Sequence, residues 1–114
     1  MATIMVVDDE KDIRDSVVAI LSKEGYKVVT AVDGDDALKK VKVAKPDLVL
    51  MDIMMPGTPV KDIVPKIKSK VIYLSVVKIS DLEKGELLGK NVCEFVEKPF
   101  DIKHLVSEVK KCLG

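Results

Sequence analysis

The sequence predicts an α/β fold in which a parallel sheet is covered by helices on both faces. Short apolar runs suited to buried strands alternate with stretches of helical period, which is typical of this fold class. The chain has 114 residues, of which 47% are apolar. That length suits one compact domain that needs no disulfide or metal to hold it together. We therefore expect a single doubly wound (βα)5 domain over residues 1–114.

Five short runs that contain β-branched residues are the expected strands. They are Thr3 to Val7, Lys27 to Ala31, Leu48 to Met51, Val71 to Leu74, and Val92 to Val96.

Three stretches between or after these runs show the spacing of an amphipathic helix. The first ends at Gly25, where a left-handed residue suits a helix C-terminus, the second ends before Pro46, and the third begins after Asp101, an expected cap. The apolar positions are Ile13, Val17, Ile20 and Leu21 in the first, Ala37, Leu38, Val41 and Ala44 in the second, and Ile102, Leu105, Val106, Val109 and Leu113 in the third.

Two further helical stretches are expected to be short or irregular. Pro65 interrupts the stretch from Val60 to Ile67, and the stretch from Asp81 to Leu88 contains Gly85 and is followed by Gly89.

Charge and cysteine content exclude several function classes. Nineteen basic residues balance nineteen acidic ones, so no basic field is available for nucleic acid or an anionic membrane. The N-terminus does not resemble a signal peptide, and no apolar run approaches the ~20 residues of a membrane span. Cys93 and Cys112 lack the spacing of a zinc or redox motif, and we expect two small buried side chains in a reducing interior. A soluble, cytoplasmic protein is the expectation.

Five polar residues follow or end the expected strands. They are Asp8, Asp9, Asp52, Ser75 and Lys98. In a doubly wound sheet the ligand site lies beyond the carboxyl ends of the strands, so these side chains are expected to meet there. Clustered carboxylates take up a proton or bind a cation, and hard oxygen ligands favour Mg²⁺, which also binds phosphate oxygens. Asp52 is then a plausible nucleophile that forms an aspartyl phosphate.

Each residue also has a simpler explanation when taken alone. Asp8 and Asp9 suit the start of a helix, Asp52 suits a turn, Ser75 suits a strand end, and Lys98 suits a solvated surface. These separate explanations do not account for five polar residues that are all expected at the same edge of the sheet. His104 has no second ligand near it in the sequence, so we assign it no functional role.

Five segments together resemble the receiver domain of two-component response regulators, the CheY-like group. They are "IMVVDDE", "TAVDGDDAL", "KPDLVLMDIMMPG", "VIYLS" and "FVEKPF", which span nearly the whole chain. The resemblance implies a flavodoxin-like sheet with strand order 2-1-3-4-5. It further implies that a histidine kinase or phosphotransfer protein donates a phosphoryl group and that an unknown downstream protein reads the result. The balanced charge argues against direct binding to nucleic acid or a membrane.

The resemblance also implies roles for individual residues. Asp52 would be the phosphoacceptor, Ser75 a switch hydroxyl and Phe95 an aromatic switch position. Lys98 would contact the phosphoryl group, and its bond to Pro99 would be cis. Asp9, Asp52 and the backbone carbonyl of Met54 would hold Mg²⁺, with Asp8 acting largely through water. The chain would assist its own phosphorylation and dephosphorylation without being an enzyme.

Departures from the family pattern keep other functions open. The third helix is expected to be shortened, and Val76 stands where a small residue is usual. Met54 and Val77 cannot orient a water molecule, which predicts slow self-dephosphorylation. One alternative is a receiver-like interaction module that works without phosphorylation. A second is a Mg²⁺-dependent phosphatase, which would need an acid or base at position 54.

Overall fold

The computed structural model describes residues 2–53, 57–75, 91–97 and 101–114. Five parallel strands form one sheet in the order β2-β1-β3-β4-β5, as predicted. The strands are β1 (Thr3–Val7), β2 (Lys27–Ala31), β3 (Leu48–Asp52), β4 (Lys70–Ser75) and β5 (Val92–Glu97). The predictions for β1 and β2 were correct at both ends, and those for the other three were short by one or two residues. The expected fourth helix, Asp81 to Leu88, lies outside the described residues.

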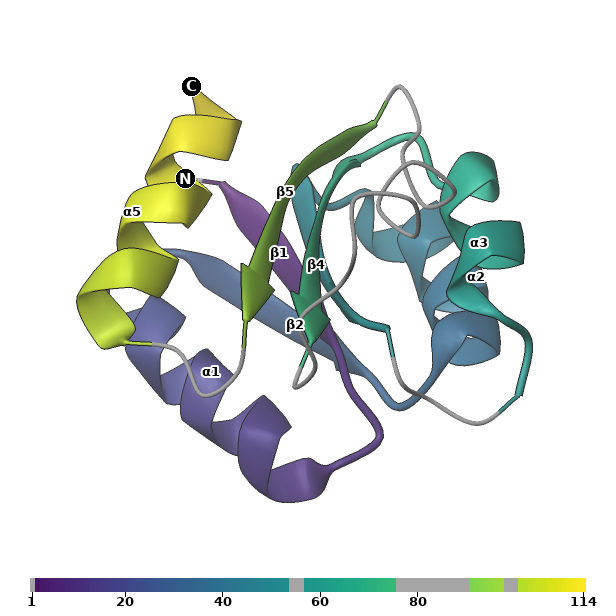
Figure 1. Ribbon diagram of the computed structural model, residues 1–114, viewed down its shortest axis with the longest axis horizontal. Helices are drawn as coiled ribbons and strands as arrows, with labels where there is room; N and C mark the ends of the chain where they lie inside the picture. Colours follow the sequence, from purple (N-terminus) through teal and green to yellow (C-terminus); the bar gives the residue numbers. More distant parts are fainter. Residues whose placement is uncertain (1, 54–56, 76–90, 98–100) are drawn as a thin grey trace.

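Helices cover both faces of the sheet (Figure 1). The helices α1 (Lys11–Lys23) and α5 (Ile102–Leu113) lie on one face, and α2 (Gly34–Ala44) and α3 (Val60–Ile63) lie on the other. Alternation along β3 explains the two cores, since Leu48 and Leu50 pack toward α1 and α5 whereas Val49 and Met51 pack toward α2 and α3. The central strands therefore read as continuous apolar runs because both of their faces are buried.

Helix ends follow the local sequence. The Asp33 carboxylate accepts a hydrogen bond from the Asp36 backbone N–H at 2.8 Å and begins α2. Asp101 caps α5 as predicted, by accepting from the Lys103 N–H at 3.3 Å. Gly25 follows α1 with a φ of 91°, the left-handed conformation that was predicted for it.

The third helix is short, as expected from Pro65. One turn of α-helix, α3, continues into a 3₁₀ turn, η1 (Val64–Lys66). The carbonyls at its end are bonded by Asn91, whose side-chain amide donates to the oxygens of Val64, Ile67 and Ser69 at 3.1, 2.8 and 3.2 Å. A residue just before β5 thus completes the end of a helix that is too short to do so itself.

We expect Asn91→Asp to lower the free energy of unfolding by about 1–3 kcal/mol, because it removes the donor and places a carboxylate against three carbonyl oxygens. Urea denaturation measures this change. Asn91→Ala, which removes the donor without adding charge, should cost less than Asn91→Asp. Equal stability of the parent and Asn91→Asp would contradict the assignment of these hydrogen bonds.

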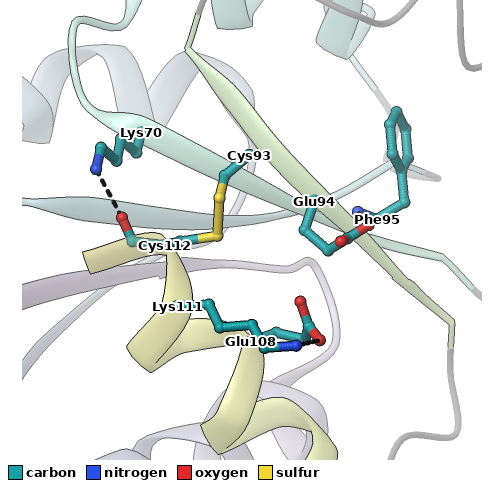
Figure 2. Close-up of a disulfide and its surroundings, with 7 residues drawn as sticks. All are labelled: Lys70, Cys93, Glu94, Phe95, Glu108, Lys111 and Cys112. Atoms are coloured by element: carbon teal, nitrogen blue, oxygen red, sulfur yellow. Dashed lines mark hydrogen bonds and ion pairs between the residues drawn. A yellow bond between two sulfur atoms is a disulfide. The ribbon is translucent and has the colours of Figure 1, made fainter. Parts of the chain in front are cut away.

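The prediction of two small, unlinked buried side chains is confirmed only for the burial of Cys112, which is 2% exposed, and is wrong for Cys93 and for the absence of a cross-link. The two residues form a disulfide between β5 and α5, with their Cα atoms 6.0 Å apart, and Cys93 is exposed (Figure 2). The physical cause is a β-bulge. Val71 pairs with Val92 whereas Ile72 pairs with Glu94, so that Cys93 is an extra residue in β5.

Candidate functional site

The site lies at the carboxyl edge of the sheet, where backbone pairing aligns the ends of β1, β3 and β4. Val7 pairs with Met51, so the next residues, Asp8 and Asp52, are neighbours. Asp52 in turn pairs with Leu74, which places Ser75 one residue beyond it. This alignment follows from the parallel register, and it is the arrangement expected of a ligand site in this fold.

Three carboxylates meet at this edge. One oxygen from each of Asp8, Asp9 and Asp52 lies within 4.8 Å of the other two. Asp8 and Asp52 are almost completely buried, at 0% and 5% exposure, and Asp9 is exposed. Like charges this close repel one another. A cation would relieve this repulsion, and the all-oxygen donor set fits a hard divalent ion such as Mg²⁺.

Local hydrogen bonds fix the position of Asp8. Its Oδ1 accepts from the Glu10 backbone N–H at 2.9 Å, and its carbonyl oxygen accepts from the Arg14 guanidinium at 2.6 Å. Asp8 therefore organises the turn between β1 and α1. The N-cap residue of α1, Glu10, makes no side-chain capping hydrogen bond, so the helix-start explanation holds for Asp8, which bonds to the Glu10 N–H, and leaves the closeness of Asp8 and Asp9 to Asp52 unexplained.

The sequence interpretation missed Arg14. It lies within a helix, whereas the predicted site residues were all sought at the ends of strands. The signal that could have identified it is that it is the only arginine among 19 basic residues. Its guanidinium brings a positive charge from α1 to the backbone beside the acidic cluster.

The other predicted residues fall into two groups. Ser75 ends β4 and is 3% exposed, and Phe95 lies half-buried in β5 with its ring stacked on Tyr73 at a centroid distance of 5.2 Å. Lys98 and the Met54 carbonyl lie outside the described residues, as do Val76, Val77 and the Lys98–Pro99 bond. Their predicted roles therefore stay predictions. His104 is exposed on α5, apart from the acidic cluster found among the described residues.

Tyr73 contributes an apolar, uncharged wall to the β4–β5 region. Burial raises the pKa of Tyr73 to about 12, which moves the ionisation of its phenol still further above neutral pH. The Phe95 ring thus packs against a neutral aromatic partner rather than a charged one.

Comparison with known proteins identifies the chain's family. The family profile described as response regulator receiver domain matches residues 4–110. The chain belongs to this family. The receiver domain is similar to CheY4 of Vibrio cholerae, at 29% identity and a TM-score of 0.87 over 98% of each chain. It is also similar to the response regulator TrrA of Thermotoga maritima, solved in complex with Mg(2+)-BeF, at 36% identity and a TM-score of 0.85 over 98% of this chain and 99% of that one.

A longer relative contains the same fold as one part. NtrX from Brucella abortus is 34% identical with a TM-score of 0.87, and the match covers 98% of this receiver domain but 27% of the NtrX chain. Among the described residues of the receiver domain, none belongs to a helix that is both long and apolar enough to cross a membrane.

Proposed function

We propose that this receiver domain accepts a phosphoryl group on Asp52 from a histidine kinase or a phosphotransfer protein, in a reaction that depends on Mg²⁺. The observation that carries the proposal is the almost buried Asp52 carboxylate at the end of a central strand, with two further carboxylates within 4.8 Å. Asp8, Asp9 and Asp52 would hold Mg²⁺ there, and its charge would offset the negative charge of the carboxylates and of the incoming phosphoryl group. TrrA with Mg(2+)-BeF supports this, because beryllium fluoride stands in for a phosphoryl group.

The transfer requires only a few side-chain groups from the protein. A carboxylate oxygen of Asp52 attacks the phosphorus, the P–N bond to the donor's imidazole breaks, and that imidazole takes a proton. The Ser75 hydroxyl, one residue beyond the pairing partner of Asp52, would donate to a phosphoryl oxygen. Lys98, which directly follows β5 in the sequence, would add a positive charge. The protein is a phosphoacceptor rather than an enzyme that turns over.

Phosphorylation would then change the β4–β5 surface. The new group adds ~1.5 to 2 negative charges beside the ends of these strands, and it would attract Ser75 and Lys98. Phe95, half-buried against Tyr73, is the side chain in β5 whose packing such a shift would change. A downstream protein that binds this surface would read the difference.

Incubation with acetyl phosphate and Mg²⁺, followed by intact-mass measurement, tests the function directly. We expect the mass of one phosphoryl group to be added, and to be absent when EDTA replaces Mg²⁺. No added mass under either condition would favour an interaction module that works without phosphorylation.

We expect Mg²⁺ alone to stabilise the receiver domain, because it relieves repulsion among Asp8, Asp9 and Asp52. At tenfold excess over its dissociation constant the gain would be about 1.4 kcal/mol, seen as a higher midpoint in thermal unfolding followed by circular dichroism. Asp9→Asn removes an exposed member of the cluster and should lose this dependence. An equal Mg²⁺ effect in both proteins would place the ion elsewhere.

A further inference from the structure

The last turn of α5 is attached to the sheet at two points. Cys112 is joined to Cys93 of β5 by the disulfide, and the Cys112 carbonyl accepts a hydrogen bond from the Lys70 ammonium of β4 at 2.8 Å (Figure 2). Packing of Leu105 and Val109 holds the middle of α5 against the same face. The disulfide is thus the covalent part of an attachment at the C-terminal end of the helix.

The bulge in β5 is what makes this cross-link possible. Val92 and Phe95 both pack on the α2–α3 side of the sheet, although strict alternation allows that only for residues an even number apart. Because Cys93 is the extra residue, both Cys93 and Glu94 stand on the α5 side. Figure 2 shows Cys93 bonded to Cys112 there, with the Phe95 ring on the other side of β5.

The two sulfur-bearing residues differ in access. Cys93 is exposed, whereas Cys112, on the buried face of α5, is only 2% exposed. Thiol–disulfide exchange requires a thiolate to reach one sulfur, and its rate depends on which sulfur is accessible. In a reducing compartment, disulfides are usually transient and redox-sensing rather than structural.

We propose that the Cys93–Cys112 disulfide is a reversible redox site, which a dithiol reduces by attack at Cys93, and that reduction loosens the last turn of α5. A dithiol's thiolate forms a bond to the Cys93 sulfur, and the bond to Cys112 breaks with its electron pair going to the Cys112 sulfur, which takes a proton. The second thiol of the reductant then displaces Cys93. Two electrons move from the dithiol, which becomes a cyclic disulfide. The proposal is independent of phosphorylation.

Loss of the cross-link leaves Lys70 and apolar packing to hold the end of α5. The closed segment runs 19 residues from Cys93 to Cys112 and contains the whole helix up to that point. Without closure, opening of α5 no longer has to preserve the contact with β5, so local opening becomes more frequent. The redox state would thereby set how tightly α5 covers its face of the sheet.

The first test is reduction of the native protein by dithiothreitol, with alkylation and intact mass used to count free thiols. We expect a rate that hardly changes with low urea concentrations, and recovery of the disulfide with oxidised glutathione. Reduction that requires global unfolding would accelerate at least about fivefold for each molar of urea. Such acceleration, or failure to reoxidise, would overturn the proposal.

A matched pair of variants tests the site of attack and its consequence. Cys93→Ser and Cys112→Ser both lack the cross-link, but the thiol that remains should react at least about tenfold faster with iodoacetamide in Cys112→Ser. Hydrogen exchange of the Val109–Leu113 amides should lose at least about tenfold protection on reduction of the parent. Equal thiol reactivity in the two variants would contradict preferential attack at Cys93, and unchanged protection would contradict the loosening of α5 on reduction.

Discussion

Asp52→Asn is expected to take up no phosphoryl group from acetyl phosphate and Mg²⁺. The amide is a poor nucleophile and carries no charge for the cation, so it removes both contributions of Asp52 at once. Its shape matches that of aspartate, so the strand end and its pairing with Leu74 should persist. Intact mass measures the loss, and circular dichroism verifies that the variant is folded.

The control for Asp52→Asn is Asp62→Asn, which makes the same chemical change on the exposed surface of α3. It should be phosphorylated at the parental rate. Full phosphorylation of Asp52→Asn would mean that another residue is the acceptor. Asp9, an exposed member of the same cluster, would be the first candidate. Loss in both variants would point to a general effect of lowered negative charge.

The sheet was predictable because its physical signals are local in the sequence. Each central strand is buried on both faces, so runs such as Ile4 to Val7 and Leu48 to Met51 have to be apolar throughout. Parallel strands in a doubly wound order place their carboxyl ends together, which explains why Asp8, Asp9 and Asp52 could be grouped before any geometry was known. Pro65 likewise predicted a shortened third helix because its effect is on its own turn.

The features that were missed depend on contacts between distant segments. Asn91 bonds to carbonyls 22 to 27 residues earlier, and nothing in its neighbours indicates this. The bulge at Cys93 breaks the period of two that places side chains on faces, so counting along β5 misplaces this residue. The pairing of the two cysteines was missed because their spacing in the sequence does not tell which side of a strand a cysteine occupies.

Loss of the disulfide should have the largest effect on stability. In the chain-entropy account, closing a loop over a separation of 19 residues stabilises the fold by about 3 kcal/mol. We therefore expect Cys93→Ser to lower the thermal midpoint by roughly 12 °C, for a domain of this size. Because Cys93 is exposed and sits at a bulge, this substitution removes little packing beside the cross-link. Thermal unfolding followed by circular dichroism, with and without dithiothreitol, measures the change.

Comparison among variants separates loop closure from the packing of Cys112. The reduced parent should melt at about the temperature of Cys93→Ser, and that variant should not respond to dithiothreitol. Cys112→Ser should be less stable than Cys93→Ser by about 1–3 kcal/mol, because it places a hydroxyl at a position that is 2% exposed among apolar side chains. If the fully reduced parent has the same thermal midpoint as the oxidised one, closure of this loop contributes nothing to stability. Equal melting of the two serine variants would mean that the end of α5 already opens to water once the cross-link is gone.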